Sequence, residues 1–339
     1  MKDAEWRWLT RMGSLGMTII KRKKYSHFRD KQSLFKVIDK IKDRVNRAYS
    51  DLLTELCKEI RGYYQQIPEM PNESGEDVKP KLLVGLSGGV DSSVVTYMAA
   101  KAIGAKNVLA ITMPARENDE SLCFSELARD KLGMSDRSVQ YVIPISEIVR
   151  KEIETINSLE WKGFGINTLT KNQTHMDRMR IGNFASRARI AILYDIARKV
   201  NGRLLGTGNR TEFVQGYAAK YGTPISFDFG VLDELYKTDI YELARVLNMP
   251  EDIIKSTPST GYFPGQTHEK ELGATWEEQD ALAFLLFEKR MGIEEIVKKY
   301  KAKREFVKTI LKRYKTSKDK RMLRQPHIKL GFIEDRDVQ

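Results

Sequence analysis

Residues 82–93 read Leu-Leu-Val-Gly-Leu-Ser-Gly-Gly-Val-Asp-Ser-Ser, and this stretch decides the fold. Its apolar start predicts a strand over 82–86, and the Ser/Gly turn that follows leads into a helix beginning near Asp91. Glycines let a backbone turn tightly and approach a ligand closely. Because the amides of such a turn and of the helix start favour an anion, the stretch predicts a phosphate-binding loop.

Asp91 lies in this loop, where a carboxylate would repel a phosphate. A divalent cation between the two resolves the conflict, because proteins hold Mg²⁺ with one or two carboxylates plus substrate phosphates. The loop is neither a Walker A sequence, which needs a lysine after the last glycine, nor Gly-x-Gly-x-x-Gly. The alternative is a glycine turn that binds nothing. The order Ser-Gly-Gly-x-Asp-Ser argues against that alternative and favours Mg-nucleotide chemistry.

Strands and helices alternate through the middle of the chain. We predict strands at 82–86, 107–113, 139–143 and 203–206, and helices at 91–103, 119–132, 145–157 and 178–200. This alternation predicts an α/β fold, a Rossmann-like parallel sheet with helices on both faces. In such sheets ligands bind beyond the carboxyl ends of the strands, which is where the glycine-rich loop lies.

Helical extensions are expected at both ends of this sheet. Residues 34–65 have helical apolar spacing, residues 68–80 form a loop, and residues 276–316 give two helices with junctions near 292 and 301–303. We therefore divide the chain into a basic N-terminal extension (1–47), a catalytic domain (48–275), C-terminal helices of the same domain (276–325) and a tail (326–339).

The composition excludes several classes of protein. Only two of the 339 residues are cysteines, too few for a disulfide framework and typical of a reducing compartment. The four histidines are scattered without zinc-ligand spacing. No apolar run approaches the roughly 18 residues of a membrane span, and the start has no signal-peptide pattern. We expect a cytoplasmic protein with no membrane partner.

The net charge of +12 belongs to the two ends of the chain. Residues 1–47 hold 14 Lys/Arg against 5 Asp/Glu, and residues 298–324 hold 13 against 2. Basic ends can bind nucleic acid or another anionic ligand. A solvated helix face is the simpler explanation, so we do not expect a nucleic-acid partner.

The loop resembles the pyrophosphate loop of the ATP pyrophosphatases, which are adenine nucleotide alpha-hydrolase-like proteins. Later motifs resemble one branch of them, the NAD synthetases. These motifs begin at Gly206, Gly216, Leu235, Pro258 and Gly265, and they read Gly-Thr-Gly-Asn-Arg-Thr-Glu, Gly-Tyr-Ala-Ala-Lys-Tyr-Gly, Leu-Tyr-Lys-Thr, Pro-Ser-Thr-Gly and Gly-Gln-Thr-His-Glu-Lys-Glu-Leu-Gly. Their order and approximate spacing resemble the family over about residues 48–325.

The resemblance implies a two-step, ATP-dependent amidation. The carboxylate of nicotinic acid adenine dinucleotide (deamido-NAD) attacks the α-phosphorus of ATP, and pyrophosphate leaves. Ammonia then attacks the acyl-adenylate, which gives NAD and AMP. The implied cofactor is Mg²⁺, and ATP is the co-substrate. Catalysis of this kind consists mostly of positioning and charge neutralisation.

The resemblance also implies which residues form the site. The metal ligands would be Asp91 and Glu212. ATP and its pyrophosphate would contact Gly85, Leu86, Ser87, Gly88, Gly89, Val90, Asp91, Ser92, Ser93, Thr207, Lys237 and Ser259. Deamido-NAD would contact Arg187, Lys220, Asp228 and Lys320. The implied catalytic residues are Asp91, Lys237 and Asp228.

Some of these residues have simpler explanations. Glu212 could cap a helix, Arg187 could be a surface charge, and Lys237 could be a solvated lysine. Asp228 follows Thr-Pro-Ile-Ser where the family has a Gly-Gly turn. His268 stands where the family has a carboxylate, and Asp319 stands where it has a histidine. These departures concern the acceptor side, so the acceptor is open between deamido-NAD and another carboxylate.

The nitrogen source is expected to be free ammonia or ammonia from a separate subunit. About 80 residues precede the loop, too few for an amidase domain of about 100–150 residues. Family members of this size are homodimers, and the helices near 34–65 and 178–200 are candidates for that contact. The segment 258–273 is expected to be mobile without ligand.

Two alternatives stay open at this point. One is another pyrophosphate-loop ligase that adenylates a different carboxylate or a tRNA base. The other is a non-catalytic protein that binds a nucleotide or a nucleic acid.

Overall fold

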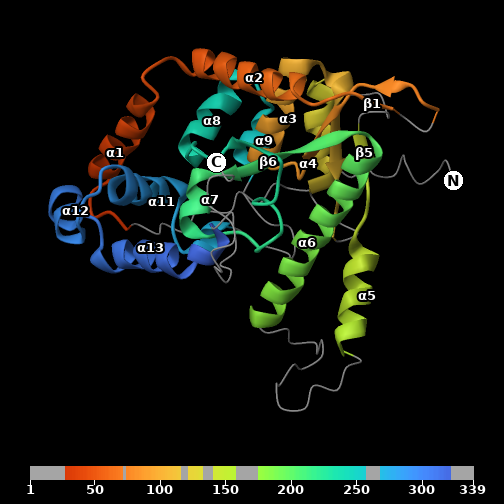
Figure 1. Ribbon diagram of the computed structural model, residues 1–339. Helices are drawn as coiled ribbons and strands as arrows, with labels where there is room; N and C mark the ends of the chain where they lie inside the picture. Colours follow the sequence, from red (N-terminus) through yellow and green to blue (C-terminus); the bar gives the residue numbers. More distant parts are fainter. Residues whose placement is uncertain are drawn as a thin grey trace, which may run out of the picture.

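The structure is a computed structural model that describes residues 27–71, 74–115, 121–132, 140–157, 175–256 and 268–321. Its centre is a five-stranded parallel sheet in the order β5-β4-β3-β6-β7 (Figure 1). The strands are β3 (Lys81–Gly85), β4 (Val108–Thr112), β5 (Gln140–Val142), β6 (Gly202–Asn209) and β7 (Phe229–Leu232). The predicted α/β fold with a parallel sheet is confirmed.

Alternate residues of the central strand enter two different cores. Leu82 and Val84 of β3 pack with α2 (Tyr49–Gln65), α3 (Val90–Ile103) and α8 (Lys237–Val246). Leu83 packs on the other face with α5 (Ser146–Asn157) and α6 (His175–Lys199). Successive side chains of a strand point to opposite faces, so a strand covered on both faces must be apolar throughout. The expected helices on both faces are therefore present.

The chain changes direction across the sheet at β3. From β3 the chain passes through α3 to β4 on one side, and it later returns to β6 on the other side of β3. In open parallel sheets, ligands bind where the strand order reverses, outside the carboxyl ends of two such strands. The glycine-rich loop follows β3, and α7 (Arg210–Gln215) follows β6. Both therefore begin at the position where this fold places its ligands.

Helices from both ends of the described chain form a separate core beside the sheet. These are α1 (Lys31–Arg44), α11 (Trp276–Ala283), α12 (Ile293–Tyr300) and α13 (Arg304–Thr316), which Figure 1 shows together at one end of the molecule. Ile41, Leu282 and Ile310 are among the side chains that they bury. The helical extensions predicted from the sequence are thus present.

Some elements differ from the prediction. The pattern at 34–65 forms two helices, because Asn46 adopts a left-handed conformation (φ 51°) after α1 and α2 starts anew at Tyr49. The predicted loop at 68–80 contains a hairpin of β1 (Met70–Pro71) and β2 (Asp77–Val78). Residues 276–316 form three α-helices rather than two, with the breaks at the two expected junctions, near Gly292 and at Lys301 (φ 53°).

Neither the strand β7 nor the helix α8 was predicted. β7 carries little local signal, because it is only four residues long and contains a glycine. The remaining helical segments are η2 (Ala105–Asn107), α4 (Ser121–Lys131), α9 (Glu251–Lys255), α10 (His268–Leu272), the π-helical turn η3 (Phe284–Glu288) and η4 (Lys318–Lys320). Among the residues that the structure describes, no helix has the length and apolar character needed to cross a bilayer.

Parts of the sequence-based assignment lie outside the described residues. They are Ser259, most of the segment 258–273, the first 26 residues and the tail 326–339.

Candidate active site

The glycine-rich loop between β3 and α3 is held by two serines. The Ser87 amide donates to Ser92 Oγ at 3.1 Å, and the two hydroxyl groups lie 3.0 Å apart. Ser92 also donates to the Gly89 carbonyl oxygen at 3.1 Å. Gly88 has a φ of 77°, a left-handed conformation that a side chain would disfavour. The Ser and Gly residues of the motif therefore give this loop its shape.

Asp91 lies in the first turn of α3, where side chains from two other strand ends reach it. Lys237, at the start of α8 beyond β7, donates from Nζ to Asp91 Oδ2. Asn209, the last residue of β6, donates from Nδ2 to Asp91 Oδ1 at 2.9 Å. The loop, β6 and α8 thus converge on one carboxylate, and Lys237 is not the solvated lysine that the sequence left possible.

Glu212 caps the helix in which it lies. Its amide donates to Asn209 Oδ1 at 3.0 Å, and its Oε2 accepts from the Asn209 amide at 3.4 Å, which forms a capping box. Asn209 therefore connects Glu212 to Asp91. Burial, and next the charge of Asp91, raise the pKa of the Glu212 carboxyl, while Lys237 opposes the shift. A carboxyl with this raised pKa gains from a nearby cation.

Lys237 is completely buried. Burial opposes its charge, but Asp91, with Tyr241 and Glu212, overcomes this and raises the pKa of the ammonium above its ordinary value. Its Nζ also lies 5.2 Å from the centre of the Trp276 ring, a favourable cation–π position. The residue therefore keeps a fixed positive charge beside the phosphate-binding loop.

The donor set at this position suits a hard cation. Asp91 and Glu212 supply carboxylate oxygens, the ligands that Mg²⁺ prefers. Within the described ranges, no group of three or more His, Cys, Asp or Glu side chains is arranged as a metal site. A cation here would depend on oxygens of the ligand as well, which is the usual situation for Mg²⁺ bound with a nucleotide.

Three of the four residues predicted to bind deamido-NAD lie together. Arg187 of α6 donates from Nε to the Lys220 carbonyl oxygen at 3.0 Å. Lys220 forms an ion pair with Asp319 (3.4 Å), and Lys320 donates to the Gly216 and Ala218 carbonyl oxygens at 2.9 and 2.7 Å. Lys320 thus binds the turn that follows α7, at Gly216 and Ala218. The same segment continues to Lys220, which Arg187 of α6 contacts.

Asp228 is not brought to Asp91. Its backbone and Oδ2 pair with Leu204, in the amino-terminal half of β6, and its Oδ1 accepts from Tyr194 at 3.3 Å. Leu204 precedes Asn209 by five residues, about 16 Å along a strand. The catalytic role suggested for Asp228 therefore has no support from its position in a single chain and stays a prediction.

Thr207 lies in the carboxyl-terminal half of β6, two residues before Asn209, and it is partly buried. Glycines flank Thr207 on both sides, at 206 and 208. Neither position has room for a side chain, because the segment before β7 lies close to both. A Cβ at Gly206 would clash with the Phe227 ring, and one at Gly208 would approach the Pro224 carbonyl oxygen to 3.1 Å. These two glycines therefore serve packing, and the predicted contact of Thr207 with ATP stays a prediction.

His268, which begins α10, is buried with both ring nitrogens unpartnered. Its ring centre lies 4.7 Å from that of Tyr217 and 5.4 Å from that of Trp276, both edge-on. Burial, and next the Lys237 ammonium, lower the pKa of His268 from 6.5 to about 3. The side chain is thus a neutral aromatic ring at the edge of the site, at the position where the resemblance implies a carboxylate.

This histidine predicts a loss of stability in acid. Below about pH 6.5 the unfolded chain protonates His268 and the folded chain does not until about pH 3, so stability present above pH 6.5 is lost as pH falls. The loss at pH 5 is about 2 kcal/mol. We expect His268→Phe, which keeps the ring contacts, to lose less stability between pH 7 and pH 5 in urea unfolding. Equal losses in both proteins would contradict this assignment.

Sequence reasoning missed the residues that join these elements. Asn209 belongs to the motif at 206–212, and an Asn at the end of a strand and the start of a helix is an N-cap signal that could have identified it. Asp280 of α11 gave no signal, yet it is fully buried and accepts from Thr211 and Thr238. Burial raises the pKa of Asp280 to about 7 against these hydrogen bonds.

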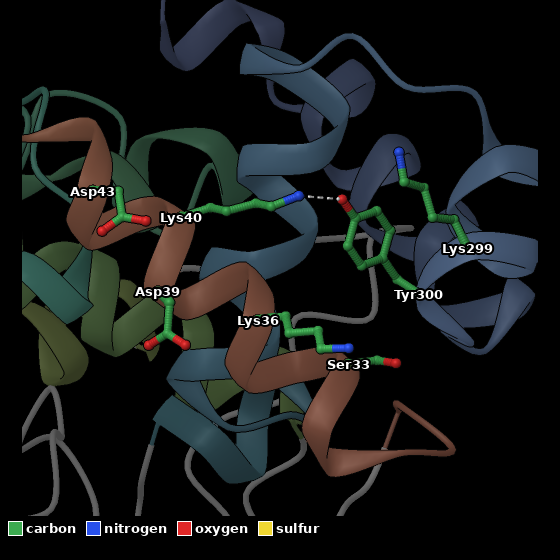
Figure 2. A pocket seen from close by; sticks show the side chains of 7 residues that line it. All are labelled: Ser33, Lys36, Asp39, Lys40, Asp43, Lys299 and Tyr300. Atoms are coloured by element: carbon green, nitrogen blue, oxygen red, sulfur yellow. Dashed lines mark hydrogen bonds between the residues drawn. The ribbon is translucent and has the colours of Figure 1, made fainter.

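A separate hollow of about 450 Å³ lies away from these residues. It is lined by Ser33, Lys36, Asp39, Lys40 and Asp43 of α1 and by Lys299 and Tyr300 of α12. Figure 2 shows Lys40 reaching the Tyr300 hydroxyl, a contact of 3.0 Å. Because it contains none of the predicted site residues and mixes three lysines with two aspartates, it is not the candidate site.

Known proteins resemble this chain over most of its length. A sequence profile of the NAD synthase family matches residues 71–324. The NH(3)-dependent NAD(+) synthetase of Pyrococcus furiosus is 33% identical over 248 residues, which is 73% of this chain and 88% of that protein. The enzyme of the same name from Thermococcus kodakarensis is 35% identical over 241 residues, 71% of this chain and 86% of that protein.

Solved structures share the fold. The NMN synthetase of Francisella tularensis has a TM-score of 0.64 and 23% identity, and the match covers 83% of this chain and 99% of that one. The NH3-dependent NAD synthetase of Campylobacter jejuni has a TM-score of 0.61 with the same identity and the same two coverages. The loop, the convergent Asp91 and Lys237, and the sequence matches lead to one conclusion: this chain belongs to the NAD synthase family.

Proposed function

We propose that the protein catalyses ATP-dependent amidation of deamido-NAD with ammonia, releasing AMP and pyrophosphate. The observation that carries the proposal is the convergence of Asp91, Lys237 and Glu212 on the phosphate-binding loop at the carboxyl ends of the strands. A loop that only turned the chain would not need a completely buried lysine beside it. Membership of the NAD synthase family supports the same reaction.

The chemistry consists of two displacements. A carboxylate oxygen of the acceptor forms a bond to the α-phosphorus of ATP, and the bond to pyrophosphate breaks. The ammonia nitrogen then forms a bond to the acyl carbon, AMP leaves, and the nitrogen loses a proton. When bound, Mg²⁺ supplies charge neutralisation for the triphosphate.

The side chains of the chain have distinct tasks in this scheme. Asp91 and Glu212 would hold the cation. Lys237 neutralises Asp91 and offers a fixed ammonium to the phosphates, and the Ser87–Ser93 loop with Thr207 and Ser259 would bind ATP. Buried charges act strongly because little water screens them.

The acceptor is proposed to be deamido-NAD, with Arg187, Lys220 and Lys320 on its anionic groups. Since one structural neighbour is named an NMN synthetase, the carboxylate analogue of NMN is the competitor to test. We expect purified protein with ATP, Mg²⁺ and ammonium to release AMP with deamido-NAD at a higher kcat/KM than with nicotinic acid mononucleotide. The reverse ratio would assign the alternative carboxylate, and no AMP with either would refute the proposed reaction.

We also propose a homodimer. Large apolar side chains are exposed on consecutive elements at one side of the molecule, namely Tyr141 and Val142 of β5, Ile148 of α5 and Met179 of α6. β5 is an edge strand of the sheet, and exposed apolar edges favour association. Figure 1 shows α5 and α6 projecting as a pair from the sheet.

The dimer prediction separates the two candidate contacts. We expect the double variant Ile148→Asp, Met179→Asp to have the mass of one chain in light scattering, while Phe35→Asp on α1, where the side chain is even more exposed, stays dimeric. Dissociation by Phe35→Asp alone would place the contact on the N-terminal helices instead. The cytoplasmic location stays a prediction.

A further inference from the structure

A single buried carboxylate lies between the two helices that carry Glu212 and Lys237. Asp280 of α11 is completely buried. Its Oδ1 accepts from the Thr211 hydroxyl, and its Oδ2 accepts from the Thr238 amide at 2.8 Å and the Thr238 hydroxyl at 2.6 Å. Thr211 precedes Glu212 in α7, and Thr238 follows Lys237 in α8. One carboxylate thus binds the chain neighbour of each of these functional side chains.

Thr211 closes the network. Its hydroxyl oxygen accepts from the Lys237 amide at 3.0 Å while its proton goes to Asp280. A hydroxyl has one proton to donate, so the direction of each hydrogen bond is determined. The backbone of Lys237 and the side chain of residue 211 are therefore tied to each other and to α11. The Thr238 amide, in the first turn of α8, also favours a negative charge on Asp280.

Stability alone is a weak reason for this arrangement. A buried charged group pays a desolvation cost, and apolar residues of similar volume often replace such groups without loss of stability. Hydrogen bonds depend on direction as well as distance, so the bonds of Asp280 orient the starts of α7 and α8 in a way that an apolar side chain of the same size does not. The hydrogen bonds of Asp280 reach both site helices, through Thr211 of α7 and Thr238 of α8.

We propose that Asp280 is a positioning residue that sets the Glu212 carboxylate and the Lys237 ammonium relative to Asp91. This inference rests on the proposed function of that site. Asp280 itself contacts no substrate; it acts through Thr211 and Thr238. Because a displacement of about 1 Å in a catalytic group can reduce a rate about 100-fold, losing this tie lowers turnover without removing any reacting group.

The test compares variants that keep volume and differ in hydrogen bonding. Asp280→Asn and Thr211→Val break the tie, and Thr211→Ser keeps the hydroxyl. Glu278→Gln is the matched control, because Glu278 is a buried carboxylate of the same helix whose bonds go to the Thr275 and His27 amides instead. For each we measure kcat, the KM of ATP, the Mg²⁺ concentration at half-maximal rate and the melting temperature.

We expect Asp280→Asn and Thr211→Val to lower kcat about 10- to 100-fold and to require more Mg²⁺. Thr211→Ser should keep both kcat and the Mg²⁺ requirement at wild-type values. Glu278→Gln should lower the melting temperature without changing the Mg²⁺ requirement. If Asp280→Asn and Glu278→Gln change the melting temperature alike and leave kcat and the Mg²⁺ requirement at wild-type values, Asp280 is merely structural and the proposal is wrong.

Failure of the proposed reaction would look different. In that case the wild-type protein itself would release no AMP with either acceptor. Titration calorimetry of MgATP into wild type and Asp280→Asn then tests the role of Asp280 independently of the reaction. Weaker MgATP binding by the variant supports the inference, and equal binding overturns it.

Discussion

Asp91→Asn is expected to reduce kcat for AMP release about 1000-fold while the protein stays folded. A bound metal stabilises the transition state by several kcal/mol, and each 1.36 kcal/mol is a factor of ten in rate. Asparagine has the size of aspartate, and its one carbonyl oxygen can still accept from Asn209, but its NH₂ group cannot accept from Lys237. It lacks the charge that the cation and Lys237 need.

The measurement is AMP release at rising Mg²⁺ concentrations, with melting followed by circular dichroism. Asp51→Asn is the control, because Asp51 also lies in the first turn of a helix, α2, but is exposed and belongs to neither the loop nor the predicted site. We expect the control to match wild type. Wild-type kcat in Asp91→Asn at saturating Mg²⁺ would remove this residue from the metal site.

Lys237→Met is expected to cost both activity and stability. The ammonium is completely buried and its partner Asp91 is largely so, with 18% of the side chain exposed. Removing one partner of a buried pair leaves an unpaired charge, which typically costs 3–5 kcal/mol; for this partly exposed carboxylate we expect about 3 kcal/mol. Activity should fall at least about 100-fold, because a fixed cation beside the phosphates is lost.

A double-variant cycle tests the pair itself. Because the penalty of Lys237→Met comes from an unpaired carboxylate, adding Asp91→Asn should return part of the lost stability in urea unfolding, while activity stays absent. Lys58→Met, at an exposed position of α2, is the control for loss of a lysine. Additive stability losses in the double variant would show that the two side chains do not interact in the folded protein.

Much of the fold could be predicted because its signals are local. β3 and β4 are continuous apolar runs, and the turn after β3 contains the Gly and Ser residues that its hydrogen bonds need. The predicted helices after these strands begin within a few residues of the observed ones. β7 was not predicted, because four residues that include a glycine carry little local signal.

The site was predicted only in its separate parts. The loop around Asp91 indicated phosphate and a cation, and the resemblance indicated Lys237 and Glu212. Nothing in the residues near Lys237 shows that it lies against a carboxylate 146 positions earlier in the chain. Asp280 is the clearest omission, because an Asp in a helix otherwise rich in apolar and acidic residues looks like a surface residue.

The amino-acid sequence by itself determined the strand–loop–helix unit, the alternation that makes a parallel sheet, and the presence of an acidic residue where phosphate binds. These follow from backbone preferences and side-chain periodicity over a few residues. The tertiary structure alone decided that β6 lies beside β3, and therefore that Asn209, Glu212 and Lys237 meet Asp91. Strand order depends on how whole faces pack against one another, and no short stretch of chain encodes it.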